Sequence, residues 1–382
     1  MTINRILIIG GGIGGLSAGL ALQRRGFNVV VYERAAEIKE IGAGLIVTAN
    51  ARRALKDLGV DDDLEAMSSA DAIYSYCDYR NNAVLREVDN DAIARRHGFR
   101  TLQVHRADLH CLLLEAFKRN APENLRPAHE FVLLEQNRTS VRAVFANGHT
   151  DEGDVLIGAD GNASAVRSLL FPNEPTVFNG QVAFRALIPD ERVPASIRKL
   201  SIAMHRAPKR YLLHYPLRGG KIMNLIGCGQ SDKWKEEGWA IPATNEEFAS
   251  TYWDFAPDLL ELIHSVPHGS LFKWALRDRE PLTDWTRGRV AMLGDAAHPM
   301  TPFLGQGACL AIEDALVLGR AFAASDSVEE ALARYEGARK SRGNSVQLWS
   351  REEGRALQDP SIPQRSAVDR GLLEYDPVTV PV

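Results

Sequence analysis

The sequence predicts a mixed α/β protein, in which a domain built on a parallel sheet is interrupted by a β-rich insertion and followed by helices. Three short apolar runs, at residues 5–9, 154–158 and 289–293, each lead into a turn that contains glycine. Such runs without polar alternation are typical of parallel strands buried on both faces. Between the second and third runs, residues 173–275 contain alternating segments that indicate an antiparallel sheet.

These boundaries define two expected domains. The first is discontinuous and consists of residues 1–172 and 276–382, while residues 173–275 form the inserted domain. Residues 72–97 are candidates for joining the inserted sheet. After residue 305 the sequence is helical in pattern to about residue 350, and the proline-punctuated tail beyond it is predicted to be extended.

The composition indicates a globular protein with a small-molecule partner. Of the 382 residues, 45% are hydrophobic and 25% charged, and the net charge of −4 offers no basic surface for nucleic acid. No apolar run reaches the roughly 20 residues that span a bilayer, so we expect no membrane partner. The four cysteines have neither metal-ligand nor disulfide-framework spacing, which favours a reducing, cytoplasmic location without a metal site.

The first apolar run leads into a glycine-rich loop that satisfies the GxGxxG pattern, and a helical segment and a second apolar strand follow. The glycines permit a tight turn and a close approach to a pyrophosphate, whose charge the helix N-terminus favours. An acid at the end of the second strand can accept hydrogen bonds from ribose hydroxyls. This pattern predicts a Rossmann-like dinucleotide site without selecting the dinucleotide. Its assigned residues are Gly10, Gly12, Ile13, Gly14, Gly15, Glu33 and Arg34.

The segment from Gly294 to Ala308, with Glu313-Asp314-Ala315 after it, selects the cofactor. It resembles the group A single-component flavoprotein aromatic hydroxylases, which have the para-hydroxybenzoate hydroxylase fold. The salicylate, 3-hydroxybenzoate and 6-hydroxynicotinate hydroxylases form the branch that it resembles. This resemblance implies a GR2-type FAD-binding domain in which Asp295 binds the ribityl chain. It also implies that Pro302, Gly305, Gln306, Gly307 and Ala308 lie beside the isoalloxazine ring.

Two further segments resemble motifs of the same family. Residues 154–167 match its middle motif, in which Asp160 ends a strand and the following helix carries Arg167. Residues 105–110 match a helix start at which Arg106 reaches the ribityl-pyrophosphate region. Surface ion pairs are the alternative interpretation of both arginines. The matches together extend from about residue 6 to residue 350 in the family's order.

The resemblance also implies a reaction. NADH or NADPH reduces FAD, O₂ adds at the flavin C4a atom, and the hydroperoxide transfers a hydroxyl group to a small aromatic ring. A phenolic or carboxylated aromatic or heteroaromatic ring is expected as the substrate, and a ring hydroxyl would make it electron-rich enough for hydroxylation. The motifs do not specify the pyridine nucleotide, the ring or the position of attack. A monomer or homodimer is expected.

The segment of residues 210–216 supplies candidates for contact with the substrate. Side chains alternate along a strand, so Tyr211 and Tyr215 share one face and His214 lies on the other. In the related branch the corresponding strand faces the substrate, with a histidine or an aromatic residue at the position of Tyr211. We favour Tyr215 and then Tyr211 as catalytic contacts and keep His214 as a third candidate. The base that several relatives are thought to use is therefore absent from its usual position.

Three residues are candidates for substrate binding. Arg185 could bind a carboxylate on the substrate, with a structural ion pair as the alternative. Ile46 would make the wall near the flavin apolar, and Pro302 would lie beside both flavin and substrate. An apolar wall favours a compact aromatic ring over a sugar-like molecule.

Three other functions compete with hydroxylation. Residues 238–242 resemble half of the WxWxIP signature of flavin-dependent halogenases, but Glu237 stands where the first tryptophan belongs. A ligand-binding flavoprotein without catalytic activity would keep the cofactor motifs. An NAD-dependent dehydrogenase would not need Gly294-Asp295.

Overall fold

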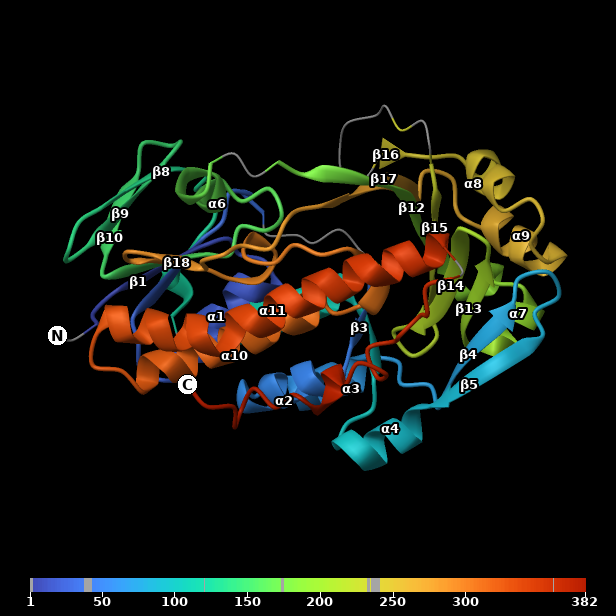
Figure 1. Ribbon diagram of the computed structural model, residues 1–382, viewed down its shortest axis with the longest axis horizontal. Coiled ribbons are helices and arrows are strands. Elements are labelled where there is room, and N and C mark those ends of the chain that lie inside the picture. The colour runs from blue at the N-terminus through green and yellow to red at the C-terminus, as the bar shows by residue number, and fades with distance from the viewer. Residues whose placement is uncertain are drawn as a thin grey trace.

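The computed structural model describes residues 3–37, 43–119, 121–172, 175–231, 234, 241–359 and 361–382. The molecule is elongated, and its two largest sheets lie toward opposite ends (Figure 1). The six-stranded sheet lies in the first part of the molecule and the eight-stranded sheet in the second. Helices α10 (Gly307–Ala323) and α11 (Val328–Gln358) run lengthwise from the first part toward the second. The predicted α/β architecture, with a β-rich insertion and C-terminal helices, is confirmed.

A six-stranded sheet forms the centre of the first part, in the order β18-β19-β11-β1-β2-β7. Pairing is parallel from β19 to β7, and every residue of β1, β2, β11 and β19 is buried. Burial on both faces explains why these strands have uninterrupted apolar sequences. The strands are β1 (Ile6–Ile9), β2 (Val29–Tyr32), β7 (Leu125–Arg126), β11 (Val155–Gly158), β18 (Thr286–Arg287) and β19 (Val290–Met292).

Helices and two small sheets complete this part of the molecule. The helices are α1 (Ile13–Gln23), α2 (Ala49–Asp57), α3 (Asp61–Met67), α4 (Asn90–His97), α5 (Arg106–Lys118) and α6 (Ala165–Leu170). The small sheets are β3 (Gly44–Val47) with β6 (Leu102–His105), and β8 (Phe131–Gln136) with β9 (Val141–Phe145) and β10 (Thr150–Gly153). Helices α1 and α10 pack closely, because a Cβ atom added at Gly319 would lie 3.1 Å from Ala21.

An eight-stranded sheet forms the second part, in the order β16-β17-β12-β15-β14-β13-β4-β5. It includes β4 and β5, which lie within residues 72–97, and β17 extends beyond residue 275. The division of the chain into two domains at the expected boundaries stays a prediction. The strands are β4 (Ile73–Asp78), β5 (Val84–Asp89), β12 (Val177–Pro189), β13 (Ile202–Ala207), β14 (Arg210–Leu217), β15 (Ile222–Gln230), β16 (Ile241–Pro242) and β17 (Leu271–Asp278).

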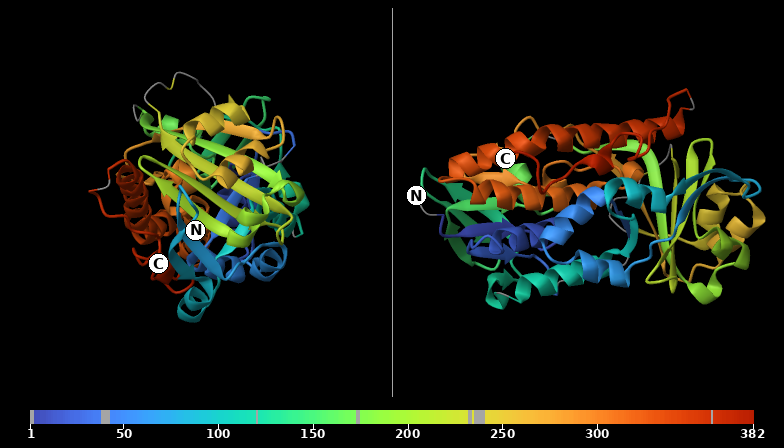
Figure 2. Two further views of the ribbon diagram at one scale, coloured as in Figure 1. Left: turned by 90° about the vertical axis from the view of Figure 1, so that its right-hand side faces the viewer. Right: turned by 90° about the horizontal axis from the view of Figure 1, so that it is seen from below.

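The two faces of this sheet have different neighbours. Helices α7 (Ala195–Leu200), α8 (Asn245–Thr251) and α9 (Pro257–His264) cover the outer face (Figure 2). There Phe184 stacks on Phe248, with ring centroids 4.7 Å apart. The inner face is directed toward the first part of the molecule.

His214 lies on the outer face, away from the two tyrosines of its strand. It is fully buried, and its Nε2 atom is 3.1 Å from Nε2 of His205 on the neighbouring strand. Burial lowers the pKa of His205 to about 4 and, together with the charge of His205, lowers the pKa of His214 to about 3. His214, predicted as a third catalytic candidate, is not placed to contact a substrate on the inner face, because the thickness of the sheet separates it from that face.

This histidine pair is expected to make stability depend on pH. Both pKa values are lower in the folded protein than in the unfolded chain, so stability is complete above about pH 6.5 and decreases as the pH falls toward 4. The expected loss at pH 5 is roughly 2 kcal/mol per histidine. His214→Gln should reduce this pH dependence by about half in urea unfolding measured at pH 5, 6 and 7. His268→Gln, at an exposed position, is the control, and equal pH dependence in all three proteins would contradict the expectation.

The C-terminal residues differ from the prediction of an extended tail. Helix α11 continues to Gln358, and the segment after it contains a one-turn helix, η5 (Leu372–Glu374). Leu372 and Leu373 are each 1% exposed, in a cluster with Ala49 and Leu310. The burial of these two leucines explains why the segment packs on the first part of the molecule. Among the described residues, no helix combines the length and apolarity needed to cross a membrane.

Candidate active site

The loop between β1 and α1 has two kinds of glycine. Gly10 has a φ of +110°, and a Cβ atom at Gly15 would lie 1.9 Å from the carbonyl oxygen of Gly10, so the backbone itself requires these two residues. Gly12, in contrast, has no neighbour in the described part of the chain within 4 Å of an added Cβ atom. It lies at the N-cap of α1, where unpaired N–H groups and the helix dipole favour an anion.

Glu33 lies beside this loop at the end of β2. Its carboxylate accepts hydrogen bonds from the backbone N–H groups of Gly11 (2.8 Å) and Ala35 (2.9 Å). The glycine loop and the acid predicted to bind the ribose are thus adjacent. Ile13 belongs to the hydrophobic core, while the side chain of Arg34 is exposed. Of these residues, Glu33 is the one whose side chain is placed to accept from a ribose next to the loop.

Residues of the middle motif connect the second and third strand ends. Asp160 caps helix α6, because its carboxylate accepts from Ser164 Oγ (2.5 Å) and from the N–H of Val166 (3.1 Å). Arg167 is 1% exposed. Its guanidinium donates to the carbonyl oxygens of Ala296 at 3.3 Å and of Ala297 at 3.2 Å. The arginine therefore has a buried position behind the Gly294-Asp295 turn, contrary to the surface interpretation.

Asp295 and Arg106 lie close enough to interact electrostatically. The side chain of Asp295 has accessible surface, yet the protein atoms around it raise the pKa of its carboxyl, while His298 and Arg106 oppose this rise. Arg106 is partly buried at the start of α5, and its backbone N–H donates to Ala43 O at 2.7 Å. An accessible acid in enclosed surroundings is suited to accept hydrogen bonds from a polyol chain.

The segment after Asp295 turns sharply into helix α10. The one-turn helix η4 (Pro302–Leu304) ends at Gly305, which has a φ of +64°. Gly307 then starts the helix, and a Cβ atom added there would lie 3.8 Å from Oδ1 of Asp295 and equally far from Cγ of Met300. Gly307 and Ala308, both partly exposed, thus present the first turn of α10 beside Asp295. Its free N–H groups favour negative charge.

Gln306 contributes to this segment differently from the prediction. Its side chain is 1% exposed and points inward, where Nε2 donates to Thr48 Oγ1 and Oε1 accepts from Asn50 Nδ2, both at 3.0 Å. Only the backbone of Gln306 is available to a cofactor. The sequence could not indicate this inward orientation, because Thr48 and Asn50 are more than 250 residues away.

The inner face of the eight-stranded sheet carries the candidate substrate contacts. Tyr211 and Tyr215 belong to one cluster there with Ile46 and Phe303, the residue after Pro302. The rings of Tyr211 and Phe303 meet edge to face, with centroids 6.4 Å apart. The structure thus brings together residues from β14, β3 and η4 that are distant in sequence.

Both tyrosines are protonated at neutral pH. Burial raises the pKa of Tyr215 to about 12, although Arg185 opposes the shift, and raises the pKa of Tyr211 well above its ordinary value. Neither side chain is a general base in the free protein. Strand β3 passes close to Tyr215, because a Cβ atom at Gly44 would lie 2.6 Å from the tyrosine hydroxyl.

Arg185 lies on the same inner face of the sheet. Its guanidinium is 5.5 Å from the ring centroid of Trp274, and its Nε atom is buried without a hydrogen-bond partner in the described part of the chain. No carboxylate among the described residues forms an ion pair with it. Burial lowers its pKa, and the charge of Arg106 adds to this effect. The interpretation as a structural ion pair is therefore not supported.

Arg206 is a further candidate for contact with the substrate that the sequence did not indicate. It pairs directly with Tyr211 across the β13–β14 hairpin and so shares the inner face. Burial lowers the pKa of its guanidinium, while Tyr76, Glu353, Tyr74 and Tyr211 oppose the shift. Its place on the inner face depends on the register of the β13–β14 hairpin, which the alternation of side chains within a single strand does not supply.

Comparisons with known proteins agree with this geometry. Residues 4–350 match a family model described as FAD binding domain. The 3-hydroxybenzoate 6-hydroxylase of Polaromonas naphthalenivorans is 35% identical over 353 residues, which cover 92% of this chain and 87% of that protein. The 6-hydroxynicotinate 3-monooxygenase of Pseudomonas fluorescens is 32% identical and covers 94% and 93%, respectively. Klebsiella pneumoniae HpxO complexed with FAD and uric acid has a TM-score of 0.86 at 27% identity, covering 98% of this chain and 93% of that one.

The fold, and the site built from the turns after β1, β11 and β19, define an FAD-binding flavoprotein with a Rossmann-like domain. More particularly, the chain belongs to the group A flavoprotein aromatic hydroxylases and is an aromatic monooxygenase that uses FAD, NAD(P)H and O₂. The comparisons do not support a halogenase. Residues 237–240 of the partial halogenase signature lie outside the described residues.

The residues present fit FAD. Open space beside Gly12 and the N-terminus of α1 suit a pyrophosphate, and Glu33 suits the adenosine ribose. The accessible carboxylate of Asp295 suits the ribityl hydroxyls, and the first turn of α10 suits the electron-rich side of a reduced flavin. The assignment of individual residues to parts of FAD stays a prediction.

Proposed function

We propose that this flavoprotein hydroxylates a small aromatic carboxylate that carries a ring hydroxyl group. The observation that supports this substrate class most directly is Arg185, a cation on the inner face of the sheet without a carboxylate partner in the described part of the chain. A substrate carboxylate would satisfy the guanidinium with charge-assisted hydrogen bonds. Two of the proteins named above, from Polaromonas and Pseudomonas, act on hydroxybenzoate and hydroxynicotinate, which are both carboxylated rings, whereas HpxO was solved with uric acid.

Tyr211, Tyr215 and Arg206 would act on the ring hydroxyl. The protonated tyrosines would donate hydrogen bonds to its oxygen, and the positive charge of Arg206 would favour the ionised form. The ionised oxygen makes the ring electron-rich, and the donated hydrogen bonds stabilise that form. This arrangement would replace the missing histidine at position 211, since the histidines of β13 and β14 lie on the outer face.

The bound FAD supplies the chemistry of oxygen transfer, and the chain provides the surroundings. Ile46, Phe303 and Trp274 would cover the ring with apolar surface and exclude water. Arg185 would fix one end of the substrate, and Tyr215 the other, so that only one ring position faces the cofactor. Pro302, directly before Phe303, would lie at this boundary.

A substrate screen tests the proposal. The purified protein is incubated with NADH or NADPH and with salicylate, hydroxybenzoates, hydroxynicotinate or aminobenzoates, each beside its analogue without the carboxylate. At least one carboxylate is expected to stimulate nucleotide oxidation and to yield a hydroxylated product in similar amount. Oxidation that yields only H₂O₂ with every carboxylate would contradict the proposal. Binding without stimulated oxidation would indicate a ligand-binding flavoprotein without catalytic activity.

A cytoplasmic location and a monomeric or homodimeric state belong to the same proposal. The scattered free cysteines support the location. Light scattering during size-exclusion chromatography measures the mass in solution directly. A tetramer would contradict the expected state.

A further inference from the structure

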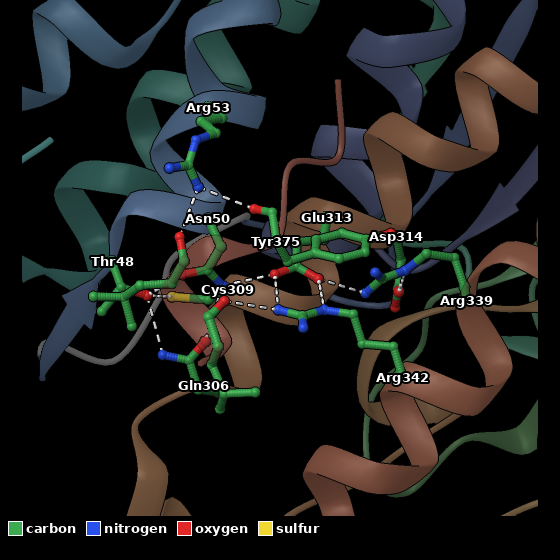
Figure 3. A network of polar contacts seen from close by, with 12 residues as sticks. Thr48, Asn50, Arg53, Gln306, Cys309, Glu313, Asp314, Arg339, Arg342 and Tyr375 are labelled. Carbon is green, nitrogen blue, oxygen red and sulfur yellow. Dashed lines mark hydrogen bonds and ion pairs between the residues drawn. The ribbon is translucent and has the colours of Figure 1, made fainter. Parts of the chain in front are cut away.

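The side chain of Gln306 is one end of a buried polar network beneath the cofactor-binding segment (Figure 3). Asn50 connects it to Glu313, because the Nδ2 group of Asn50 donates to Oε1 of Gln306 at 3.0 Å and to Oε1 of Glu313 at 2.6 Å. Thr48 Oγ1 donates to Asn50 Oδ1 at 2.6 Å, which fixes the orientation of the amide. The orientation of Gln306 thus depends on the position of Glu313.

Two arginines of α11 hold Glu313 in place. Glu313 and Arg339 are both 0% exposed and approach to 2.8 Å. Arg342 binds both carboxylate oxygens of Glu313, with Nε and the second terminal nitrogen each at 2.8 Å. Burial alone would raise the pKa of Glu313, but the two arginines lower it below its ordinary value. A bidentate pair of this kind is strong only while water is kept from it.

The C-terminal segment covers the outer side of this pair. The ring of Tyr375 lies over the guanidinium of Arg342, with its centroid 3.9 Å away, and 5.0 Å from that of Arg339. Arg342 also donates to Leu372 O at 3.1 Å. Arg53 of α2 donates to Leu373 O at 2.7 Å and to Tyr375 O at 3.0 Å. The segment is therefore fixed to both α2 and α11.

We propose that Tyr375 is a positioning residue for the cofactor-binding segment, acting through Arg342, Glu313 and Asn50 on Gln306. The proposal rests on the proposed placement of FAD beside Gln306 and Gly307. An aromatic ring over a guanidinium restricts its motion and excludes water from the Arg342–Glu313 pair. Without the ring, the pair is hydrated, Glu313 gains freedom to rotate, and the amide of Asn50 no longer holds Gln306 in one orientation.

FAD titration of the apoprotein tests this role. Tyr375→Leu, which keeps an apolar side chain without the aromatic face, should raise the Kd for FAD about tenfold. Tyr375→Phe retains the ring and should stay within about twofold of the unaltered protein. The visible spectrum and midpoint potential of the bound flavin should shift in the leucine variant alone. Equal Kd values and spectra in all three proteins would overturn the proposal.

Combining substitutions separates this role from general stability. Asn50→Ala cuts the connection to Gln306 and should itself raise the Kd, and Tyr375→Leu should then add less than about a twofold change. Additive effects would mean that Tyr375 acts by another route and would overturn the proposal. If Asn50→Ala leaves the Kd unchanged, the placement of FAD beside Gln306 fails. If Asn50→Ala raises the Kd but Tyr375→Leu does not, the placement stands and the role of Tyr375 fails.

Discussion

Replacing Gly12 with valine is expected to lower the affinity for FAD at least about a hundredfold while the free protein keeps its fold. A Cβ atom at this position meets no atom of the described residues within 4 Å, and the backbone φ of −76° is open to any residue. Only the bound pyrophosphate would compete for this space, since the glycine loop permits a close approach of phosphate to the backbone. FAD titration of the apoprotein measures the loss, and thermal unfolding of the apoprotein shows that the fold is retained.

Two other glycines provide matched comparisons. Gly337 in α11 is exposed, and no atom of the residues that the structure describes lies within 4 Å of a Cβ atom added there, so Gly337→Val should leave FAD binding unchanged. Gly15→Val should instead destabilise the protein, because its Cβ atom would lie 1.9 Å from the carbonyl oxygen of Gly10. If Gly12→Val binds FAD as tightly as Gly337→Val does, the pyrophosphate does not pass over Gly12.

The turns of the candidate FAD site that follow strand ends could be located from the sequence, while their contacts with FAD stay predictions. The carboxyl ends of β1, β11 and β19 meet at one edge of a parallel sheet, so the turns that follow them must gather there. Glycine and aspartate in these turns were therefore enough to place Gly12, Asp160 and Asp295 near one another. The alternation of side chains along β14 likewise separated Tyr211 and Tyr215 from His214.

Features that depend on contacts between distant elements could not be predicted. Asn50 and Glu313 are 263 residues apart in sequence, and nothing local indicates that they share a hydrogen bond. Arg206 required the register of the β13–β14 hairpin, which the strand patterns alone do not supply. The C-terminal segment was expected to be extended because of its prolines, although the burial of Leu372 and Leu373 determines its path. Tertiary packing decides each of these cases.

Arg185→Met is expected to lower kcat/KM for the best carboxylated substrate of the screen by a factor on the order of 100 to 1,000. The substitution keeps the length and apolar part of the side chain beside Trp274 and removes only the charge. Because Arg185 has no ion pair among the described residues, its removal leaves no protein carboxylate unpaired, and the loss reports the contact with the substrate. Turnover is measured with the FAD content of the variant matched to that of the unaltered protein.

The specificity of this loss decides whether Arg185 binds the carboxylate. An analogue of the same substrate without the carboxylate should be turned over within about threefold of the unaltered rate, since it lacks the group that the guanidinium would bind. Arg210→Met is the matched control, because Arg210 lies on the outer face of the same sheet and pairs with Asp254 at 2.5 Å. That variant should alter stability without changing the preference for the carboxylate. If Arg185→Met lowers kcat/KM equally for both substrates, Arg185 acts on the structure of the sheet or on the cofactor. If kcat/KM falls only for the carboxylated substrate, Arg185 is the group that anchors the ring.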